Sequence, residues 1–281
     1  MRDTLIHRFR DLFVDPLRGA LARLQTTAES TRLAQLASAD RYADPRCLTR
    51  HGYRCFSQND EDGLIDEILR RVGTTARTFV EFGIGNGLEN NTLALLTAGW
   101  RGVWLEGDPA SAAHVRTEFS GPISTGQLVL EQAFVTAENI EALLLKSGVP
   151  QEPDLLSIDI DGSDYWVWKA INRFRPRVVV IEYNASLGRT ARVVVPYDPA
   201  ARWSGGSHFG ASLAALEGLG REKGYALVGC SITGVNAFFV RTDCVLDRFL
   251  DPFTAARHYE PPRFGPTGAG HPPRWGPLEQ V

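Results

Sequence analysis

The sequence predicts an α/β fold built on a seven-stranded, mostly parallel sheet that ends in an antiparallel hairpin. Apolar runs of strand length alternate with helical patterns, a glycine-rich turn follows the first run, and acids follow several others. Strands that alternate with helices are joined by right-handed crossovers and therefore lie parallel. The seven runs cover residues 77–82, 102–106, 128–132, 155–159, 178–183, 226–230 and 237–241.

Helical patterns separate most of these runs, over residues 59–72, 89–98, 109–119, 138–147, 164–173 and 211–223. Only residues 231–236 lie between the last two runs. That connection is too short for a crossover, so we expect these two strands to pair antiparallel. Trp166 and Trp168 fall within a helical pattern, and we interpret them as core residues rather than a platform for a sugar.

Composition divides the chain into three parts: an N-terminal helical arm (1–52), a catalytic-sized domain (53–250) and a Pro/Gly-rich tail (251–281). Hydrophobic residues make up 43% and charged residues 22% of the chain. These values are close to globular averages, so a sizeable core is available. The prolines of the tail fit neither a helix nor a central strand, and we expect an extended arm or disorder there.

Charge and cysteine content exclude several classes of protein. A net charge of −3 gives no basic field for nucleic acid. The four cysteines have no C-x-x-C spacing, so a zinc site is not expected. Without a secretory signal, they indicate reduced thiols and a cytoplasmic protein. No apolar stretch approaches the ~18 residues of a transmembrane span.

The glycine-rich turn after the first strand predicts a cofactor site. Glu81 stands near the strand end and is followed by Gly83, Gly85 and Gly87. A dinucleotide fingerprint needs its third glycine three residues after the second, whereas here it comes after two. An acid at the strand end suits the cationic amino-acid end of S-adenosylmethionine (SAM) better than a pyrophosphate. We therefore predict that Glu81, Gly83 and Gly85 hold the methionine end; the alternative is a glycine-rich turn in some other α/β protein.

A second acid, Glu106, ends the next strand, at the spacing of about 20 residues that places a carboxylate on a ribose. We predict that Glu106 binds the ribose hydroxyls. Asp108 and Phe134 are weaker candidates for contacts with the edge and the face of adenine.

These segments resemble class I SAM-dependent methyltransferases, whose Rossmann-like sheet also ends in an antiparallel hairpin. More narrowly, Phe-Ser-Gln-Asn-Asp-Glu-Asp-Gly at 56–63 and Gly-Trp-Arg-Gly-Val-Trp-Leu-Glu at 99–106 are similar to segments of FkbM-like O-methyltransferases. The resemblance covers about residues 53–242. It departs at 157–164, where Ser-Ile-Asp-Ile-Asp-Gly-Ser-Asp replaces a pattern like Lys-Ile-Asp-Val-Glu-Gly-x-Glu. Substrate identity does not carry across that difference.

The resemblance implies methyl transfer to a hydroxyl of a small molecule or glycan, with a saccharide or polyol as the expected acceptor. Two alternatives stay open: a metal-dependent, hydroxylase-like relative without a methyl donor, and a non-catalytic binding protein with a degenerate fold. Intact glycines together with Glu81 and Glu106 argue against the second.

Acids cluster after the fourth and fifth strands. Asp159 and Asp161 follow one strand, and Glu182 and Asn184 end the next. Neighbouring strands are about 4.8 Å apart, so these side chains can face one another. Such carboxylates repel unless a proton or cation neutralises them, and hard oxygen ligands suit Mg²⁺ or another divalent ion. Related macrolide-sugar O-methyltransferases use a similar arrangement, which implies an ion that binds a sugar diol.

Asp159 is also a candidate catalytic base. The neighbours of Asp159 have simpler alternative roles. Asp164 can cap the helix at 164–173, and Asp161 with Gly162 can form a turn without any role at the site. Likewise, Ser57 can cap the helix at 59–72.

Among the histidines, His208 is the best-placed base, because it lies in a glycine-rich loop after the fifth strand. The alternative is a surface loop histidine. His51 is the second candidate.

The N-terminal arm carries an apolar stripe of Leu5, Phe9, Leu12, Phe13, Leu17, Leu21 and Leu24. This exceeds what one solvent-facing helix normally exposes. We favour self-association into a homo-oligomer, ahead of packing on the domain. Peripheral membrane contact ranks third: basic amphipathic helices bind anionic lipid, but here acids dilute the charge and Pro16 is expected to break the stripe.

Overall fold

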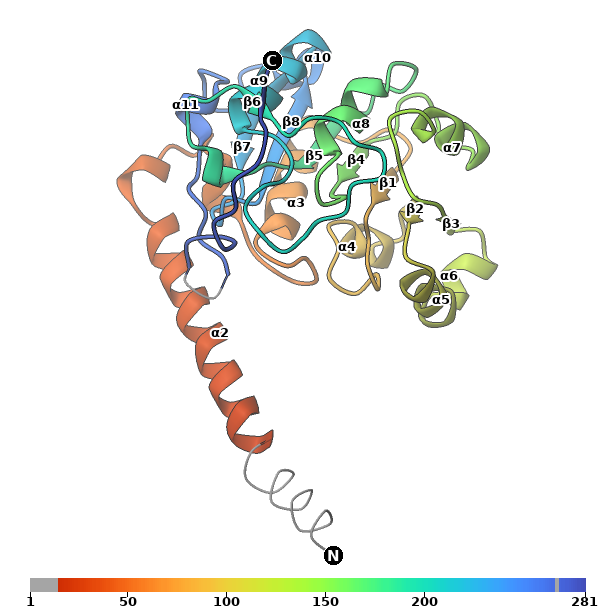
Figure 1. Cartoon of the computed structure of the whole chain (residues 1–281), viewed down its shortest axis with the longest axis horizontal. Coiled ribbons are helices and arrows are strands. Elements are labelled where there is room, and N and C mark those ends of the chain that lie inside the picture. The colour runs from red at the N-terminus through yellow and green to blue at the C-terminus, as the bar shows by residue number, and fades with distance from the viewer. Residues whose placement is uncertain (1–14, 266–267) are drawn as a thin grey trace, which may run out of the picture. The chain divides into compact units, whose positions relative to one another are not determined.

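The structure is a computed structural model that describes residues 15–265 and 268–281 (Figure 1). The chain forms two compact units, one ending at Ala43 and the other spanning Asp44–Val281. None of the helices within the described ranges has the length and apolar character that crossing a bilayer requires.

In the first unit, helix α2 spans Asp15–Ala37 and the 3₁₀ turn η2 spans Asp40–Tyr42. Pro16 lies in the first described turn of α2, so the expected break of the stripe at Pro16 stays a prediction. Leu21 and Leu24 of the predicted stripe are exposed. The stripe's first four members, Leu5 to Phe13, and the side chain of Leu17 lie outside the described part of the chain.

The second unit is built on a seven-stranded sheet in the order β3-β2-β1-β4-β5-β8-β7 (Figure 1). Strands β1 to β5 are parallel, and β8 pairs antiparallel with both β5 and β7. The predicted Rossmann-like α/β fold with its antiparallel hairpin is confirmed. The strands are β1 (Thr78–Phe82), β2 (Arg101–Glu106), β3 (Leu128–Gln132), β4 (Leu155–Ile158), β5 (Val178–Glu182), β7 (Tyr225–Cys230) and β8 (Asn236–Arg241).

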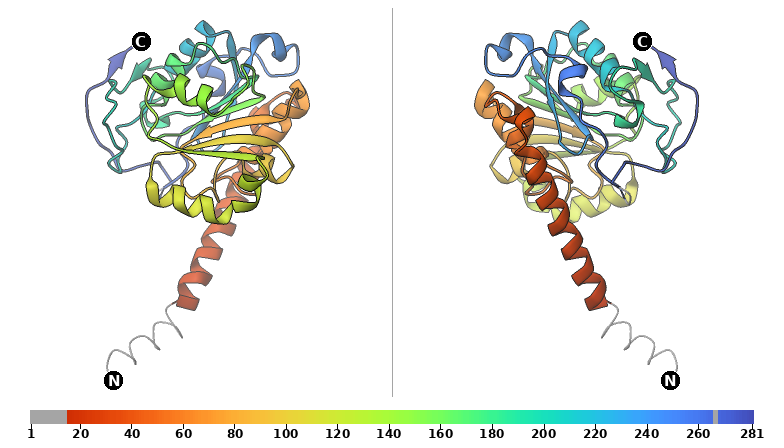
Figure 2. Two further views of the ribbon diagram at one scale, coloured as in Figure 1. Left: turned by 90° about the vertical axis from the view of Figure 1, so that its right-hand side faces the viewer. Right: turned by 90° about the vertical axis from the view of Figure 1, so that its left-hand side faces the viewer.

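Helices cover both faces of this sheet (Figure 2). Successive residues of β1 serve different cores: Phe79 packs with α3, α4 and α5, whereas Val80 and Phe82 pack with α7, α8 and α9. This alternation is the period of two of a strand buried on both sides. The helices are α3 (Glu61–Val72), α4 (Leu93–Thr97), α5 (Pro109–Glu118), α6 (Ser120–Ser124), α7 (Ile140–Lys146), α8 (Asp164–Ala170), α9 (Leu213–Glu222), α10 (Thr242–Val245) and α11 (Ala255–His258).

The first predicted boundary differs from the structure, because residues 44–52 belong to the second unit rather than to the arm. They contain the 3₁₀ turn η3 (Leu48–His51), whose Leu48 is buried. Thr49 donates its hydroxyl to the carbonyl of Cys230 in β7, at 3.2 Å. These contacts between segments far apart in sequence cannot be read from local composition.

The described part of the C-terminal tail is also packed into the second unit, against the expectation of an extended arm or disorder. It forms α11, and β9 (Glu279–Gln280) pairs antiparallel with β6 (Val193–Val194). Tyr183 at the end of β5 donates its hydroxyl to the carbonyl of Glu260, at 2.6 Å. Within the segment, Tyr259 donates its hydroxyl to the carbonyl of Ala185, and the rings of Phe264 and His271 contact each other.

Candidate active site

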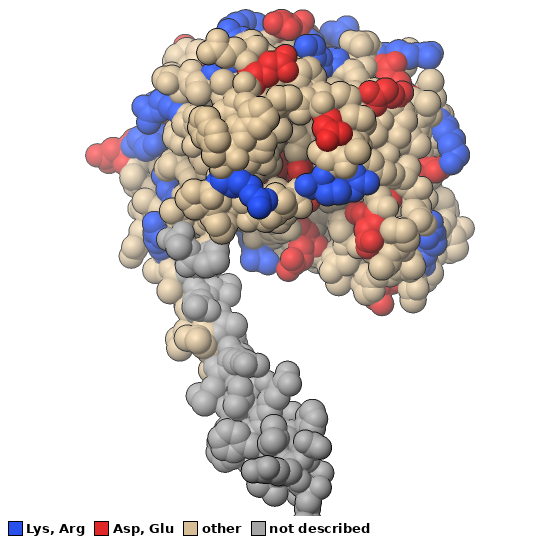
Figure 3. All heavy atoms as spheres, in the orientation of Figure 1, with Lys and Arg blue, Asp and Glu red and all other residues tan. Residues whose placement is uncertain are grey.

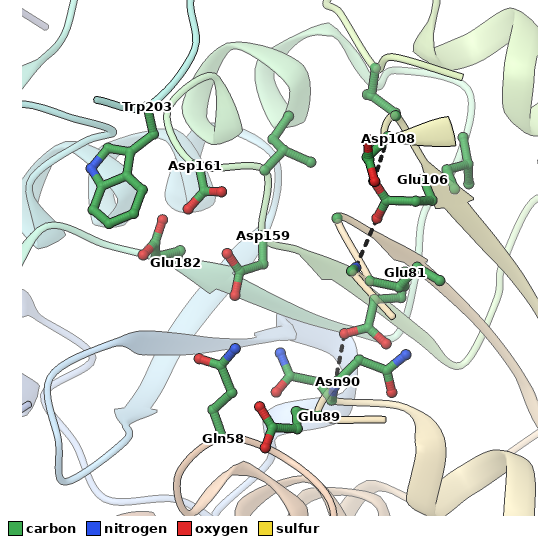
Figure 4. Close-up of a pocket in the computed structure, with 18 of the residues that line it drawn as sticks. Gln58, Glu81, Glu89, Asn90, Glu106, Asp108, Asp159, Asp161, Glu182 and Trp203 are labelled. Atoms are coloured by element: carbon green, nitrogen blue, oxygen red, sulfur yellow. Dashed lines mark hydrogen bonds between the residues drawn. The ribbon is translucent and has the colours of Figure 1, made fainter. Parts of the chain in front are cut away.

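A cavity of about 1000 Å³ opens at the carboxyl ends of the parallel strands (Figure 4). The chain runs outward from β1 to β3 and then returns to β4 beside β1, so the sheet has its topological switch point here. Ligands of open α/β sheets bind at this crevice. The lining includes nearly every predicted site residue: Glu81, Gly83, Gly85, Glu106, Asp108, Phe134, Asp159, Asp161 and Glu182.

The glycine-rich turn after β1 has two differently constrained glycines. A Cβ on Gly83 would lie 1.6 Å from the carbonyl oxygen of Asp159, so only glycine fits between β1 and β4. Gly85 has φ +55°, and a Cβ there would meet nothing within 4 Å. Packing within the protein therefore does not account for Gly85. Its bare backbone faces the cavity, where a ligand can approach closely.

Glu106 bridges the two loops beside this turn. Its Oε2 accepts a hydrogen bond from Gly85 N at 2.8 Å, and its Oε1 accepts one from Asp108 N at 2.7 Å. A carboxylate has about four lone-pair sites. Two of these remain to accept two adjacent hydroxyls, which fits the predicted role on a ribose.

Glu81 lies at the cavity, but its carboxylate is already engaged. One oxygen accepts from Asn91 N and the Ser157 hydroxyl, and the other from the N–H and the hydroxyl of Thr92, at 2.5–3.3 Å. Burial raises the pKa of Glu81 to about 7, and these hydrogen bonds oppose the shift. Glu81 therefore fixes the turn before α4, and direct contact with a methionine end is not what its geometry favours.

Asn90, which the sequence analysis did not single out, presents a free donor instead. Its Oδ1 accepts from Leu93 N at 2.9 Å, whereas its buried Nδ2 has no hydrogen-bond partner among the described residues. Asn90 also lines the cavity (Figure 4). A buried N–H₂ group without an acceptor is costly unless a ligand supplies one.

The two candidates for adenine contacts differ in what they already bind. Asp108 caps α5, because its carboxylate accepts from Ser111 N at 2.7 Å, and this bond lowers the pKa of Asp108. Phe134 is 40% exposed, and the guanidinium of Arg202 lies 3.5 Å above its ring centroid. Asp108 is thus engaged as a helix cap, whereas the ring of Phe134 stacks with a guanidinium.

Three acids meet at the ends of β4 and β5. One carboxylate oxygen from each of Asp159, Asp161 and Glu182 lies within 4.8 Å of the others. Burial, followed by the charges of neighbouring acids, raises the pKa of Asp159 and of Glu182 well above the usual range. The buried Oε2 of Glu182 has no hydrogen-bond partner within the described ranges. The carboxylates of this acidic triad are so close that they repel one another unless a proton or a cation neutralises part of their charge.

Asn184 does not join the triad, contrary to the prediction. Its Nδ2 donates to the carbonyls of Ser207 and Phe209, and its Oδ1 accepts from Ser186 N as the cap of η4 (Ala185–Leu187). The backbone turns away one residue after β5, so the side chain holds the following loop.

The loop after β4 is held in an uncommon conformation. Asp161 has φ +57°, a region that residues other than glycine rarely adopt. Asp164 is the first residue of α8, and its buried carboxylate accepts from the N–H groups of Ile160 and Gly162, both at 2.9 Å. Burial raises the pKa of Asp164 to about 6. Asp164 therefore secures the loop that presents Asp161 and is not the predicted helix cap, because Ser163 occupies the cap position of α8.

His208 does not reach the cavity. Its Nε2 lies 2.9 Å from the carbonyl of Pro277, and the C-terminal segment covers the ring. The other candidate, His51, contacts Pro45 and Glu67 away from the cavity.

His271 lines the cavity instead. Its ring contacts those of Trp203, Phe209 and Phe264, with centroids 4.6–5.6 Å apart. Burial raises the pKa of Asp161, and the charge of His271 opposes that rise, which places the two side chains near each other. His271 was not predicted as a site residue, because it lies in the segment whose Pro/Gly-rich composition indicated a tail.

The segment before α3 contributes Gln58, Asn59 and Glu61 to the cavity lining. Ser57 accepts from Asp62 N, and the Asp62 carboxylate accepts in return from the Ser57 hydroxyl and three backbone N–H groups. The predicted structural role of Ser57 is thus observed, although Asp60 is the residue at the helix cap position.

Trp168 is fully buried among α8, β7 and β8, as expected for a core residue. Trp166 is half-buried and donates its Nε1 to the carbonyl of Val195. Around the cavity mouth, basic and acidic side chains are interspersed on the face shown in Figure 3, without a large patch of one sign.

No family profile and no curated protein matches the sequence. Solved structures similar to this chain include PhzM, a pyocyanin biosynthetic protein (18% identity, 62% of this chain and 53% of PhzM, TM-score 0.38). Another is the O-methyltransferase from Bacillus cereus in complex with SAH (17% identity, 75% of this chain and 89% of that chain, TM-score 0.39). A third is SAM-bound CalS10, an amino pentose methyltransferase from Micromonospora echinaspora (13% identity, 65% of this chain and 90% of CalS10, TM-score 0.41). This chain spans about half the length of PhzM. TM-scores under 0.5 do not establish a shared fold or function, and the topology above stands on the strand order itself.

Proposed function

We propose that this chain is a SAM-dependent O-methyltransferase whose acceptor is a saccharide or other polyol. The observation that carries the proposal is a single cavity with two chemically different ends. Gly85 and Glu106 form an end suited to a nucleoside, and the acidic triad of Asp159, Asp161 and Glu182 forms the other. A methyl group can pass directly from donor to acceptor only if both bind in one continuous space.

The residues at the nucleoside end fit an adenosyl group with a methionine moiety. Glu106 has two lone-pair sites left for the ribose hydroxyls, and Gly85 presents bare backbone beside it. The unpartnered Nδ2 of Asn90 suits a carboxylate, which is the acceptor that a methionine end supplies. SAM, when bound, supplies an electrophilic methyl group on its sulfonium.

The residues at the acidic end fit a divalent cation. Asp159, Asp161 and Glu182 converge, and the unpartnered Glu182 Oε2 is a ready ligand atom. Oxygen ligands of this kind suit Mg²⁺ or Ca²⁺. Such an ion would neutralise the carboxylates and polarise the hydroxyls of a bound diol.

In the proposed reaction, the acceptor oxygen bonds to the methyl carbon while the carbon–sulfur bond breaks, and the hydroxyl proton leaves to a base. The protein aligns the groups and takes that proton. Asp159 is the first candidate for the base, because its carboxylate lies at the acidic end of the cavity where the acceptor would bind. His271 is the second candidate, because it also lines the cavity and lies near Asp161.

Calorimetric titration with S-adenosylhomocysteine (SAH) tests the proposal without a known acceptor. The wild type should bind, and Glu106→Ala should weaken binding by about 1–3 kcal/mol, which is the range for charged hydrogen bonds. Glu131→Ala, on β3 and paired with Lys146, is the matched control and should bind as the wild type does. A folded wild type that binds no SAH would refute the proposal. If it still bound divalent cations, the metal-dependent relative would be favoured.

A further inference from the structure

Two consecutive residues of the long loop between β6 and α9 reach into different ends of the cavity. Arg202 stacks on Phe134, with its Cζ 3.5 Å above the ring centroid. Trp203 lies at the acidic end with Asp161 and Glu182 in Figure 4, and its indole packs edge-on against His271. Both residues line the cavity.

The position of adenine follows from the strand order, given the proposed function. The reacting methyl must point to the acidic triad, at β4 and β5, and the ribose binds Glu106, at the end of β2. The base then extends away from β4, toward β3, the neighbour of β2 on the other side. Phe134 follows β3 directly and, at 40% exposure, is the aromatic surface available there. Purines stack well on such rings.

Arg202 already occupies this surface. A separation of 3.5 Å is van der Waals contact between two flat groups, so no third ring fits between them. A guanidinium resembles a base in being planar and in stacking on aromatic faces. We propose that Arg202 holds the adenine subsite while the cofactor is absent, and that adenine displaces it on binding.

Displacement of Arg202 also breaks the hydrogen bonds that its Nη1 donates to the carbonyls of Ala200 and Ala201, at 3.0 and 2.9 Å, and these bonds hold the loop directly before Trp203. The indole is anchored by its Nε1 to the carbonyl of Gly206, at 2.9 Å, and by His271 from the C-terminal segment. Cofactor binding therefore rearranges the wall against which an acceptor would lie. Arg202 acts as a positioning residue that couples the two ends of the site and favours binding of the cofactor before the acceptor.

The test compares SAH affinity by calorimetry in the wild type, Arg202→Ala and Arg202→Lys. Adenine would no longer compete with a stacked guanidinium in Arg202→Ala, so its Kd should be about two- to five-fold lower, as expected from the loss of one exposed cation–π pair. Arg202→Lys keeps the charge but not the planar group, and its Kd should change in the same direction. Arg189→Ala is the matched control, because Arg189 packs over Tyr259 outside the cavity; its Kd should match the wild type.

Tryptophan fluorescence supplies a second readout. SAH should change the emission of the wild type, and most of that change should vanish in Trp203→Phe. Unliganded Arg202→Ala should already resemble the liganded wild type. Unchanged or weaker SAH binding by both Arg202 variants, with normal wild-type binding, would overturn this inference alone. If neither the wild type nor Arg189→Ala binds SAH, the proposed function is overturned as well.

Discussion

Gly85 offers a sharp test of where the cofactor lies, because its missing side chain is not explained by the protein's own packing. Gly85→Ala would place a methyl group in the cavity, with no protein atom within 4 Å. The residue keeps its N–H, so the hydrogen bond to Glu106 can persist. Any large effect on ligand binding would therefore come from the methyl group itself.

The magnitude has two parts. The positive φ of +55° costs an alanine roughly 1–2 kcal/mol in the folded state. For a domain of this size that corresponds to a fall in Tm of about 2–8 °C. A methyl group pressed against a close ligand costs about 1–3 kcal/mol more, by analogy with overpacking, and this part appears only in the complex. We therefore expect SAH to bind about 5- to 150-fold more weakly.

Differential scanning fluorimetry and SAH calorimetry separate the two parts. Gly73→Ala is the matched control, since Gly73 has φ +72° and open space around its Cβ position but lies at the end of α3, outside the cavity lining. With ψ 172°, Gly73 lies in a region almost restricted to glycine, so Gly73→Ala should lose at least as much stability as Gly85→Ala and keep its SAH affinity. If folded Gly85→Ala binds SAH as the wild type does, the cofactor does not approach this turn and the assignment of the nucleoside end is wrong.

Four further outcomes are expected. Mg²⁺ or Mn²⁺ should bind the wild type in calorimetry. Glu182→Gln should lose this binding, whereas Glu118→Gln, on the exposed surface of α5, should keep it. Methyl transfer that continues in excess EDTA would contradict a role for the metal in the reaction. Burial raises the pKa of Glu81 to about 7 and, with the charge of Glu61, that of Asp60 to about 8. Raised carboxyl pKa values stabilise the folded protein at low pH, and that contribution is lost as pH rises through 7 to 8, so the Tm of the unliganded protein should fall between pH 5 and pH 9; a Tm that rises over this window would refute the assignment. With an acceptor found by screening saccharides against labelled SAM, His271→Asn should reduce kcat at least ~10-fold at unchanged SAH affinity if His271 is the base, and His208→Asn should not; equal effects would remove the distinction between them. Deleting residues 1–40 should convert a dimer to a monomer in light scattering if the arm mediates self-association. If the full-length and the truncated protein are both monomers, self-association is refuted, and packing of the arm on the domain or membrane contact is left.

The sheet could be predicted because its strands are buried on both faces. Val178–Ile181 is continuously apolar, Leu155–Ile158 is interrupted only by Ser157, and the helices between the strands keep their own period. The short elements that were missed, β6 with β9 and the turn η3, owe their structure to contacts across the fold. Nothing in a pair such as Val193–Val194 marks it as a strand without its partner at Glu279–Gln280.

The site could be predicted where a residue's position follows from a strand end. Glu106, Asp159 and Glu182 lie where the strand pattern placed them. The incorrect predictions concern side chains on loops that follow the strands. Asn184 donates to a backbone carbonyl of a later loop, and His208 contacts the C-terminal segment, far away in sequence. His271 reaches the cavity only because the C-terminal segment folds back over β5.

The contact between Gly83 and the carbonyl of Asp159 limits how this site can be altered for new acceptors. The cofactor turn and the acid-bearing loop touch through backbone atoms, so a larger residue at 83 would displace Asp159 as well. A combinatorial library aimed at acceptor range should therefore leave the ends of β1 and β4 intact. Diversity belongs at Trp203 and Phe264, which line the same cavity from loops that do not form this contact.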